Sequence, residues 1–323
     1  MLAFTLRRIG QAVLVMLAVG LIAFSLFRFV GDPVIFMLGQ DATDEQRREI
    51  TRALGLDRPF YIQYLSFIGH ALQGEFGLSL RQVQPVSKLI MERLPATLEL
   101  SLVAAFFALA AGIPMGVYTA LRPRTFFSQV LLAISLAGVS LPSFLIGILL
   151  ILVFSVQLGW MPSFGRGDTV QLGWWSTGLL TASGLKSLVL PAITLGLFQM
   201  TLIQRLVRSE MMEVLRTDYI RFARARGLTD RAVHFGHALK NTLVPVITIT
   251  GLQLGAIIAF AIITETVFQW PGMGLLFIQA VGAADVPVMA AYLCLIAFFF
   301  VVINLVVDLL YYAVDPRLRL RPT

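Results

Sequence analysis

The stretch RLVRSEMMEVLRTDYIRFARARGLTDRAVHFGHALK (residues 205–240) is a strongly basic interval between two apolar runs of the chain. A simple connector between two helices needs only a few residues, whereas this stretch has about 35. Its only glycines are Gly227 and Gly236 and it has no proline, so it can fold into helices. We interpret it as a docking element that contacts something outside the apolar part of the molecule.

The composition indicates a membrane protein. Hydrophobic residues make up 58% of the 323 residues and charged residues 13%, with a mean hydropathy of +0.83. A soluble domain carries about a quarter charged residues. The net charge of +7 is compatible with nucleic-acid binding, but arginine-rich cytoplasmic loops explain it more simply. The single cysteine, Cys294, excludes an internal disulfide and indicates no redox or metal role.

Six apolar runs are long enough to cross a bilayer as helices, which takes about 20 residues. They comprise residues 9–30, 96–121, 126–156, 188–203, 243–264 and 286–314. The third run contains Pro142, and we expect one tilted or proline-kinked helix there. Two spans in its place would put either the basic stretch or the N-terminal arginines outside. The expected fold is therefore an all-α integral membrane protein with six transmembrane helices.

The orientation follows from the distribution of arginines. With the N-terminus inside, the short outer loops hold only Arg166 and Lys186 as basic residues. The cytoplasmic segments then hold the 205–240 stretch together with Arg7, Arg8, Arg122, Arg124, Arg317, Arg319 and Arg321. This asymmetry follows the positive-inside rule, so we expect both termini to be cytoplasmic. The four tryptophans agree, because they fall in or beside the outer loops: Trp160, Trp174, Trp175 and Trp270.

The N-terminal part of the chain is expected to be a membrane anchor followed by an outer segment. The first run reads as a retained anchor because no small-residue cleavage site marks a signal peptide. The long extracytoplasmic segment, Gly31 to Pro95, has nearly balanced charge and two helix-like stretches, at 44–54 and 60–72. We divide the chain into residues 1–94, a five-span core at 95–315 with a loop at about 205–242, and a cytoplasmic tail at 316–323.

Enzyme chemistry finds little support. The phosphate-cradling, metalloprotease and serine-hydrolase motifs are absent. His234 and His237 could share a helix face, but no carboxylate or thiol completes a set of metal ligands. We therefore expect neither catalysis nor a metal or other cofactor on this chain, and ATP, if used, must bind to another chain.

Four charges fall inside the predicted spans: Arg28, Glu99, Glu265 and Asp308. Most of them lie within about two turns of a predicted interface, where a long side chain can reach the headgroups. Glu265 and Asp308 are possible structural charges, and Asp308 is the candidate for a buried pair. So few central carboxylates argue against coupling to an ion gradient.

The basic stretch can be divided further. We expect a helix at 218–226, a break or close backbone approach at Gly227, and a second helix capped by Thr229 or Asp230. In the second helix Ala232, Phe235, Gly236 and Leu239 would share a face. That face could lie on lipid headgroups or insert into a groove of a partner protein.

At this stretch the sequence resembles the permease subunits of binding-protein-dependent ABC importers, in the oligopeptide, dipeptide and nickel branch. The segment DYIRFARARGLTDRAVHFGHALKNTLVPV (residues 218–246) is similar to the family's cytoplasmic coupling loop, with Ala223, Gly227 and Leu239 at its alanine, glycine and leucine positions. Arg221, Phe222, His237 and Lys240 depart from the general pattern. The motifs common in the peptide branch of the family are kept at Ala223 to Leu228 and at His237 to Asn241.

Further stretches in the right order extend the resemblance over nearly the whole chain: LRRIG (6–10), GDP (31–33), LGLDRPFYIQYL (54–65), GEFGLSL (74–80), RLPATLELSL (93–102), ETVFQWPGMG (265–274) and NLVVDLLYYAVDPRLR (304–319). The long segment after the first span is similar to that of the first of the family's two permease subunits.

The resemblance implies a type I importer permease that carries short peptides across the inner membrane of a bacterium. It also implies a second permease subunit, two ATPase subunits that bind ATP and magnesium, and an extracytoplasmic binding protein. The residues implied in the contact with the ATPases are Arg221, Phe222, Ala223, Ala225, Gly227, Leu228, His237, Leu239 and Asn241. Nickel chelates or glutathione-like molecules are alternative substrates, and a stand-alone secondary transporter is a remote alternative.

Overall fold

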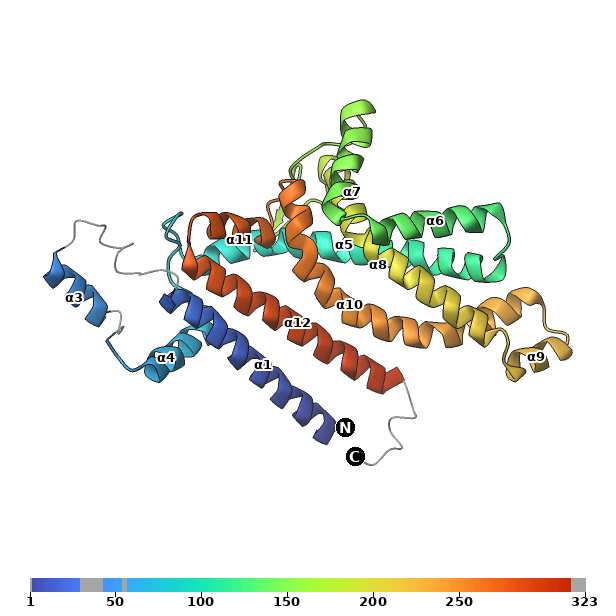
Figure 1. Ribbon diagram of the computed structural model, residues 1–323, viewed down its shortest axis with the longest axis horizontal. Coiled ribbons are helices and arrows are strands. Elements are labelled where there is room, and N and C mark those ends of the chain that lie inside the picture. Colours follow the sequence, from blue (N-terminus) through green and yellow to red (C-terminus); the bar gives the residue numbers. More distant parts are fainter. Residues whose placement is uncertain (1, 30–42, 54–56, 315–323) are drawn as a thin grey trace. The chain divides into compact units, whose positions relative to one another are not determined.

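The computed structural model describes residues 2–29, 43–53 and 57–314. Its helices are α1 (Leu2–Phe29), α3 (Asp44–Ala53), α4 (Phe60–Leu72), α5 (Val86–Leu121), α6 (Phe126–Ser140), α7 (Ser143–Leu150), α8 (Ala182–Val214), α9 (Asp218–Ala225), α10 (Leu239–Val267), α11 (Met273–Gly282) and α12 (Val286–Val314). Two π-helical segments, η1 (Ile151–Gln157) and η2 (Ala232–Ala238), and one hairpin of β1 (Val170–Leu172) and β2 (Trp175–Thr177) complete the described part (Figure 1).

The described helices agree with a membrane-spanning fold. Four of them, α1, α5, α8 and α12, are long and apolar enough to cross a bilayer. The pair of α6 with α7–η1 and the two halves of α10, bent by 49°, bring the count to six if each bent pair is one span. The expected all-α membrane fold is confirmed. The bounds of α3 and α4 agree with the two helical stretches predicted after the first span, 44–54 and 60–72.

The third apolar run differs from the prediction of one tilted or kinked helix. It breaks at Leu141 and Pro142, and its two parts meet at 116°. Proline cannot donate a backbone hydrogen bond and pushes the residue before it out of the helical region. Leu141 accordingly is extended, with φ −95° and ψ 138°, and Pro142 is the N-cap of α7. The single-helix prediction is therefore wrong.

The chain forms two compact units, residues 1–95 with 272–302 and residues 96–271 with 303–323. In the first unit α4 packs on α1. Tyr64 Oη donates a hydrogen bond to the carbonyl oxygen of Leu17 at 2.6 Å, and the ring of Phe24 lies 5.1 Å from that of Phe60. Asp285, buried just before α12, accepts hydrogen bonds from the Ser79 hydroxyl and the Arg81 backbone N–H. The division of the chain at residue 94 stays a prediction.

In the second unit α5 and α8 approach closely because small residues line their contact. A Cβ atom at Gly112 or Gly116 would lie 2.8 Å from a carbonyl oxygen of α8, that of Met200 or Gln204. Glycine at such positions is what lets membrane helices pack backbone to backbone. The same helices supply the core on which the α8–α10 loop rests, including Val207 and Met211, both fully buried.

Candidate functional site

The loop between α8 and α10 begins later than the sequence suggested. α8 runs on to Val214, so the first ten residues of the basic stretch, 205–214, belong to the long helix itself. The loop proper then turns at Leu215 to Thr217 and enters α9 (Figure 1). The predicted helix at 218–226 is thus confirmed as α9. Asp218 in its first turn and Arg224 in its last have the signs that the helix dipole favours.

Gly227 ends α9 in a Schellman motif. Its φ is +77°, a left-handed conformation that glycine adopts without strain. The Gly227 N–H donates to the Arg224 carbonyl at 2.9 Å, and the Leu228 N–H donates to the Ala223 carbonyl at 3.3 Å. Among the described residues no atom lies within 4 Å of where a Cβ of Gly227 would be. Of the two predicted roles, the structure therefore supports the helix break, and no close approach by the described part of the chain accompanies it.

The second helix of the loop is capped by Thr229, whose hydroxyl accepts from the Ala232 N–H at 3.4 Å. It runs as η2 directly into α10. Its buried residues are Val233 and Ala238, whereas Phe235 of the predicted face is 53% exposed, so that face stays a candidate for contact with lipid or a partner. The wider π-helical turn places residues five apart, such as Val233 and Ala238, on one face.

Apolar packing holds α9 against the rest of the unit. Ile220 and Ala223 are buried in a cluster that includes Met211 of α8 and Val233 and Ala238 of η2. One hydrogen bond adds a polar tie, from the Asn241 side-chain amide at the start of α10 to Tyr219 Oη at 2.7 Å. The position of α9 is thus set by its neighbours in the chain.

The opposite face of α9 and the turn after it expose apolar side chains. Phe222 is 64% exposed, Leu228 41% and Tyr219 42%. The guanidinium of Arg226 lies 5.9 Å from the centre of the Phe222 ring, within cation–π range. Arg221 forms an ion pair with Asp218 at 3.1 Å, but both side chains are highly exposed, so it stabilises α9 little.

The predicted site residues therefore divide into two groups. Ala223, Gly227, Leu239 and Asn241 shape the loop: they are packed, end the helix or bridge to α9. The others lie at the surface of the loop, namely Arg221, Phe222, Ala225, Leu228 and His237. The structure adds the exposed aromatic side chain of Tyr219, and Phe235 of the predicted face is exposed as well.

Glu99, for which the sequence predicted no buried pair, forms a buried polar centre. It is 3% exposed in α5, and its carboxylate pairs with the guanidinium of Arg166, which is 7% exposed. The same carboxylate accepts hydrogen bonds from the Thr177 hydroxyl at 2.7 Å and from two backbone N–H groups, Gly178 at 3.0 Å and Leu179 at 3.1 Å. Arg166 is the basic residue of the hairpin loop. A carboxylate in a predicted span and an arginine in the next outer loop were the sequence features that could have indicated this pair.

Glu265, the second possible structural charge, is also buried, at 0% exposure. The Thr97 hydroxyl of α5 donates to its Oε1 at 2.6 Å. Close by, Trp270 Nε1 donates to the Ala96 carbonyl at 3.0 Å, so two contacts join the end of α10 to α5. The Asp308 side chain lies outside the described residues, and its role stays a prediction. Among the described residues no three His, Cys, Asp or Glu side chains gather as metal ligands.

Long apolar helices joined by a rigid loop with exposed aromatic and arginine side chains define a polytopic helical membrane protein. Comparison with known protein families then identifies the family to which the chain belongs. Residues 112–320 match the binding-protein-dependent transport system inner membrane component, and residues 1–101 match the N-terminal region of such membrane components. The chain belongs to this family, and it is therefore a multi-pass inner-membrane permease that works with other subunits of an ABC transport system.

Relatives agree over the full length. The chain is 42% identical to the di/tripeptide transport system permease protein DppB of Pseudomonas aeruginosa, with 99% of each chain covered. It is 39% identical to the dipeptide transport system permease protein DppB of Escherichia coli K12, again with 99% of each covered. In solved structures, an inward-facing MetNI methionine ABC transporter matches with a TM-score of 0.55 at 20% identity, covering 70% of this chain and 96% of that one. The type I importer permease fold is thus established.

Proposed function

We propose that this chain is one permease subunit of an ATP-driven importer of short peptides. Relatives that are 37–42% identical over 99% of the chain are named as di/tripeptide or dipeptide permeases, which supports the substrate class. In this proposal a second, homologous permease completes the pathway, an extracytoplasmic binding protein delivers the peptide, and two further subunits bind and hydrolyse ATP. The chain itself performs no chemistry.

The orientation in this proposal follows the arginines of the sequence. Both termini and the α8–α10 loop face the cytoplasm, whereas the hairpin between η1 and α8 faces outside. The segment between α1 and α5 also lies outside, since long segments are exempt from the charge rule.

The ATPase contact in this proposal is the exposed face of α9. The observation that carries it is the exposure of Phe222, at 64%, on a helix whose opposite face is buried. A large exposed aromatic side chain on a firmly held helix is what inserts into a groove of a partner, and an aromatic anchor of this kind often dominates the binding energy. Exposed arginines around it suit an acidic rim on the partner.

Replacing the anchor tests this assignment. In the complete complex reconstituted in liposomes, we expect Phe222→Ala to weaken ATPase retention by about tenfold or more, as for an interface hot spot, and to reduce ATP-driven dipeptide uptake. Phe126→Ala is the matched control, because Phe126 is 82% exposed at the start of α6 and not on α9.

Wild-type ATPase retention and uptake with Phe222→Ala would contradict the docking assignment. The substrate is tested separately, by competing labelled dipeptide with unlabelled dipeptide, nickel chelate or glutathione. If the nickel chelate or glutathione, but not unlabelled dipeptide, reduces uptake of the labelled compound, the substrate is that competitor and not a short peptide.

A further inference from the structure

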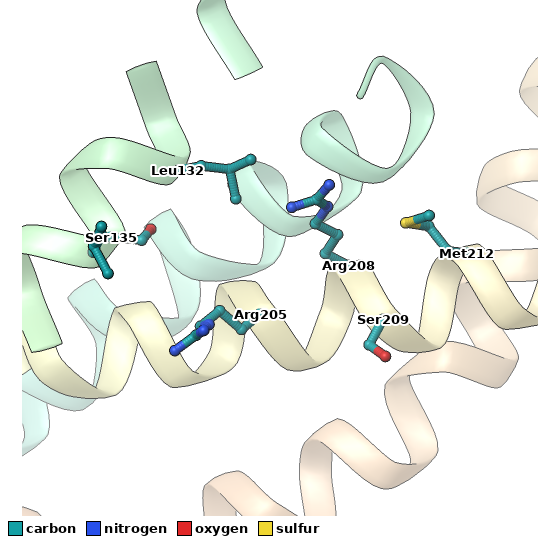
Figure 2. A pocket seen from close by; sticks show the side chains of 7 residues that line it. Leu132, Ser135, Arg205, Arg208, Ser209 and Met212 are labelled. Atoms are coloured by element: carbon teal, nitrogen blue, oxygen red, sulfur yellow. The ribbon is translucent and has the colours of Figure 1, made fainter. Parts of the chain in front are cut away.

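α6 and α8 line an open pocket with two arginines in its wall. Its volume is about 480 Å³, and it lies wholly within the second compact unit. The lining residues are Leu132, Ser135 and Leu136 of α6 and Arg205, Arg208, Ser209 and Met212 of α8. Figure 2 shows Arg208 extending from α8 toward Leu132 on α6, with Arg205 one turn earlier along the same helix.

The two arginines have hydrogen-bond donors to spare. Among the described residues no carboxylate lies within the 4.0 Å ion-pair distance of Arg205 or Arg208. The Nε of Arg208 is buried and lacks a hydrogen-bond partner within the part of the chain that the structure describes. Each guanidinium carries five N–H donors in a planar fork whose geometry fits phosphate oxygens. The pocket therefore presents guanidinium donors whose geometry suits the oxygens of a phosphate group.

The rest of the lining selects an amphiphilic ligand. Leu132, Leu136 and Met212 form an apolar wall, and Leu136 is 62% exposed. Ser209 adds a hydroxyl next to the arginines. A small polar anion would use only the arginine and serine side, whereas a phospholipid would set its phosphate against the arginines and an acyl chain along the leucines.

The position of the pocket along the apolar runs fits a lipid headgroup. Arg205 and Arg208 follow shortly after the apolar run that ends at residue 203, and Leu132 and Leu136 lie within the run that begins at residue 126. Arginines at the end of one predicted span and leucines within another are expected near the boundary between headgroups and hydrocarbon. Basic pockets between membrane helices at this depth are suited to anionic lipid headgroups.

We propose that Arg205 and Arg208 form a phosphate site for an anionic phospholipid, with the acyl chain on Leu132 and Leu136. The assignment to the cytoplasmic leaflet rests on the proposed orientation, but the binding itself does not. The phosphodiester of one bound lipid would offset one of the two positive charges, and its acyl chain would fill space between α6 and α8.

The test is a titration of phosphatidylglycerol into the delipidated complete complex, read by native mass spectrometry, with phosphatidylcholine as background. The Arg205→Gln/Arg208→Gln variant is expected to bind phosphatidylglycerol at least about tenfold more weakly, because hydrogen bonds between charged partners are lost. The Arg122→Gln/Arg124→Gln variant is the control: it removes two exposed arginines outside the pocket and should change the affinity less than about twofold.

Each outcome supports or contradicts the lipid site without a transport assay. The test of the lipid site therefore stays valid even if the proposal of a peptide substrate fails. Equal affinity of wild type and Arg205→Gln/Arg208→Gln for phosphatidylglycerol would overturn the site. Displacement of the lipid by millimolar inorganic phosphate, with the same dependence on the arginines, would keep the phosphate site and identify free phosphate as its source. If the glutamine variant does not assemble, Arg205→Lys/Arg208→Lys replaces it. Wild-type affinity of that variant would show that the arginine fork is not used, against the proposal.

Discussion

Two loops of the second compact unit are held in different ways. The hairpin loop, residues 158–181, is fixed to α5 by the buried pair of Glu99 and Arg166 and by two backbone N–H groups that donate to the same carboxylate. The α8–α10 loop is held by the apolar contacts of Ile220 and Ala223, with one hydrogen bond from Asn241 to Tyr219. The hairpin loop therefore depends largely on a polar centre around one buried carboxylate, and the α8–α10 loop depends on distributed packing.

This difference has a physical consequence. Directional hydrogen bonds to a buried carboxylate specify one geometry, and losing one partner leaves the other charge buried without compensation. Apolar packing is less directional and is lost in small steps. A loop that must transmit movement from a partner without coming apart is better held by packing, whereas a loop that must keep one shape is better held by the polar centre.

The largest expected effect is the presence or absence of thiol labelling, which reports the side of the membrane on which each loop lies. In a Cys294→Ser background, a cysteine at Asp230 is expected to react with an impermeant thiol reagent only from the cytoplasm. A cysteine at Gln171, at the exposed hairpin, is expected to react only from outside. Labelling of whole cells and of inverted vesicles measures both, and modification of both positions from one side would refute the six-span orientation.

The next effect is the loss of the buried charge pair. Glu99→Gln leaves the Arg166 guanidinium buried without its counter-charge, which costs about 3–5 kcal/mol of the free energy of unfolding. Unfolding of the purified complex in detergent measures this. Glu92→Gln is the control, because Glu92 forms an exposed pair with Lys88 and should cost less than about 1 kcal/mol.

A second substitution separates the charge effect from loss of shape. Adding Arg166→Met to Glu99→Gln removes the uncompensated cation and should recover a large part of the lost stability. If Glu99→Gln destabilises no more than Glu92→Gln, the view that this one pair fixes the hairpin loop is wrong.

The α8–α10 loop was largely predictable from the sequence because its signals are local. A glycine between two polar helical segments marked the end of α9, and Thr229 marked the next cap, and both lie where expected. The π-helical register of η2 was not predicted, since it depends on packing against α8 and α9 and not on local preference. The apolar pattern likewise could not show that α8 continues to Val214.

The hairpin loop was much less predictable. Glu99 and Arg166 are 67 residues apart in the chain, and only the folded unit brings them together. Hydropathy placed the start of the second span at Ala96, whereas α5 begins at Val86 and so carries Glu99 deep into a helix. The 116° break at Pro142 was also missed, because proline predicts a break or a kink without giving its angle.

The smallest of these effects concerns the end of α9. Gly227→Leu forces a branched residue into a φ of +77°, at a cost of about 1–2 kcal/mol. Since no atom of the described residues lies within 4 Å of the missing Cβ, this cost comes from the backbone conformation and not from a collision with them. Gly227→Asn is the control, because asparagine adopts the left-handed conformation more readily and should cost less.

The two variants also separate stability from coupling. If α9 is the ATPase contact, Gly227→Leu should lower dipeptide uptake per ATP hydrolysed in the assembled complex, because the Schellman motif sets where Leu228 and the following helix point. Gly227→Asn should keep most of the uptake. Full coupled transport by assembled Gly227→Leu complexes would show that the orientation of this turn does not matter for coupling, and the comparison between the two loops would then rest on the stability of the hairpin loop alone.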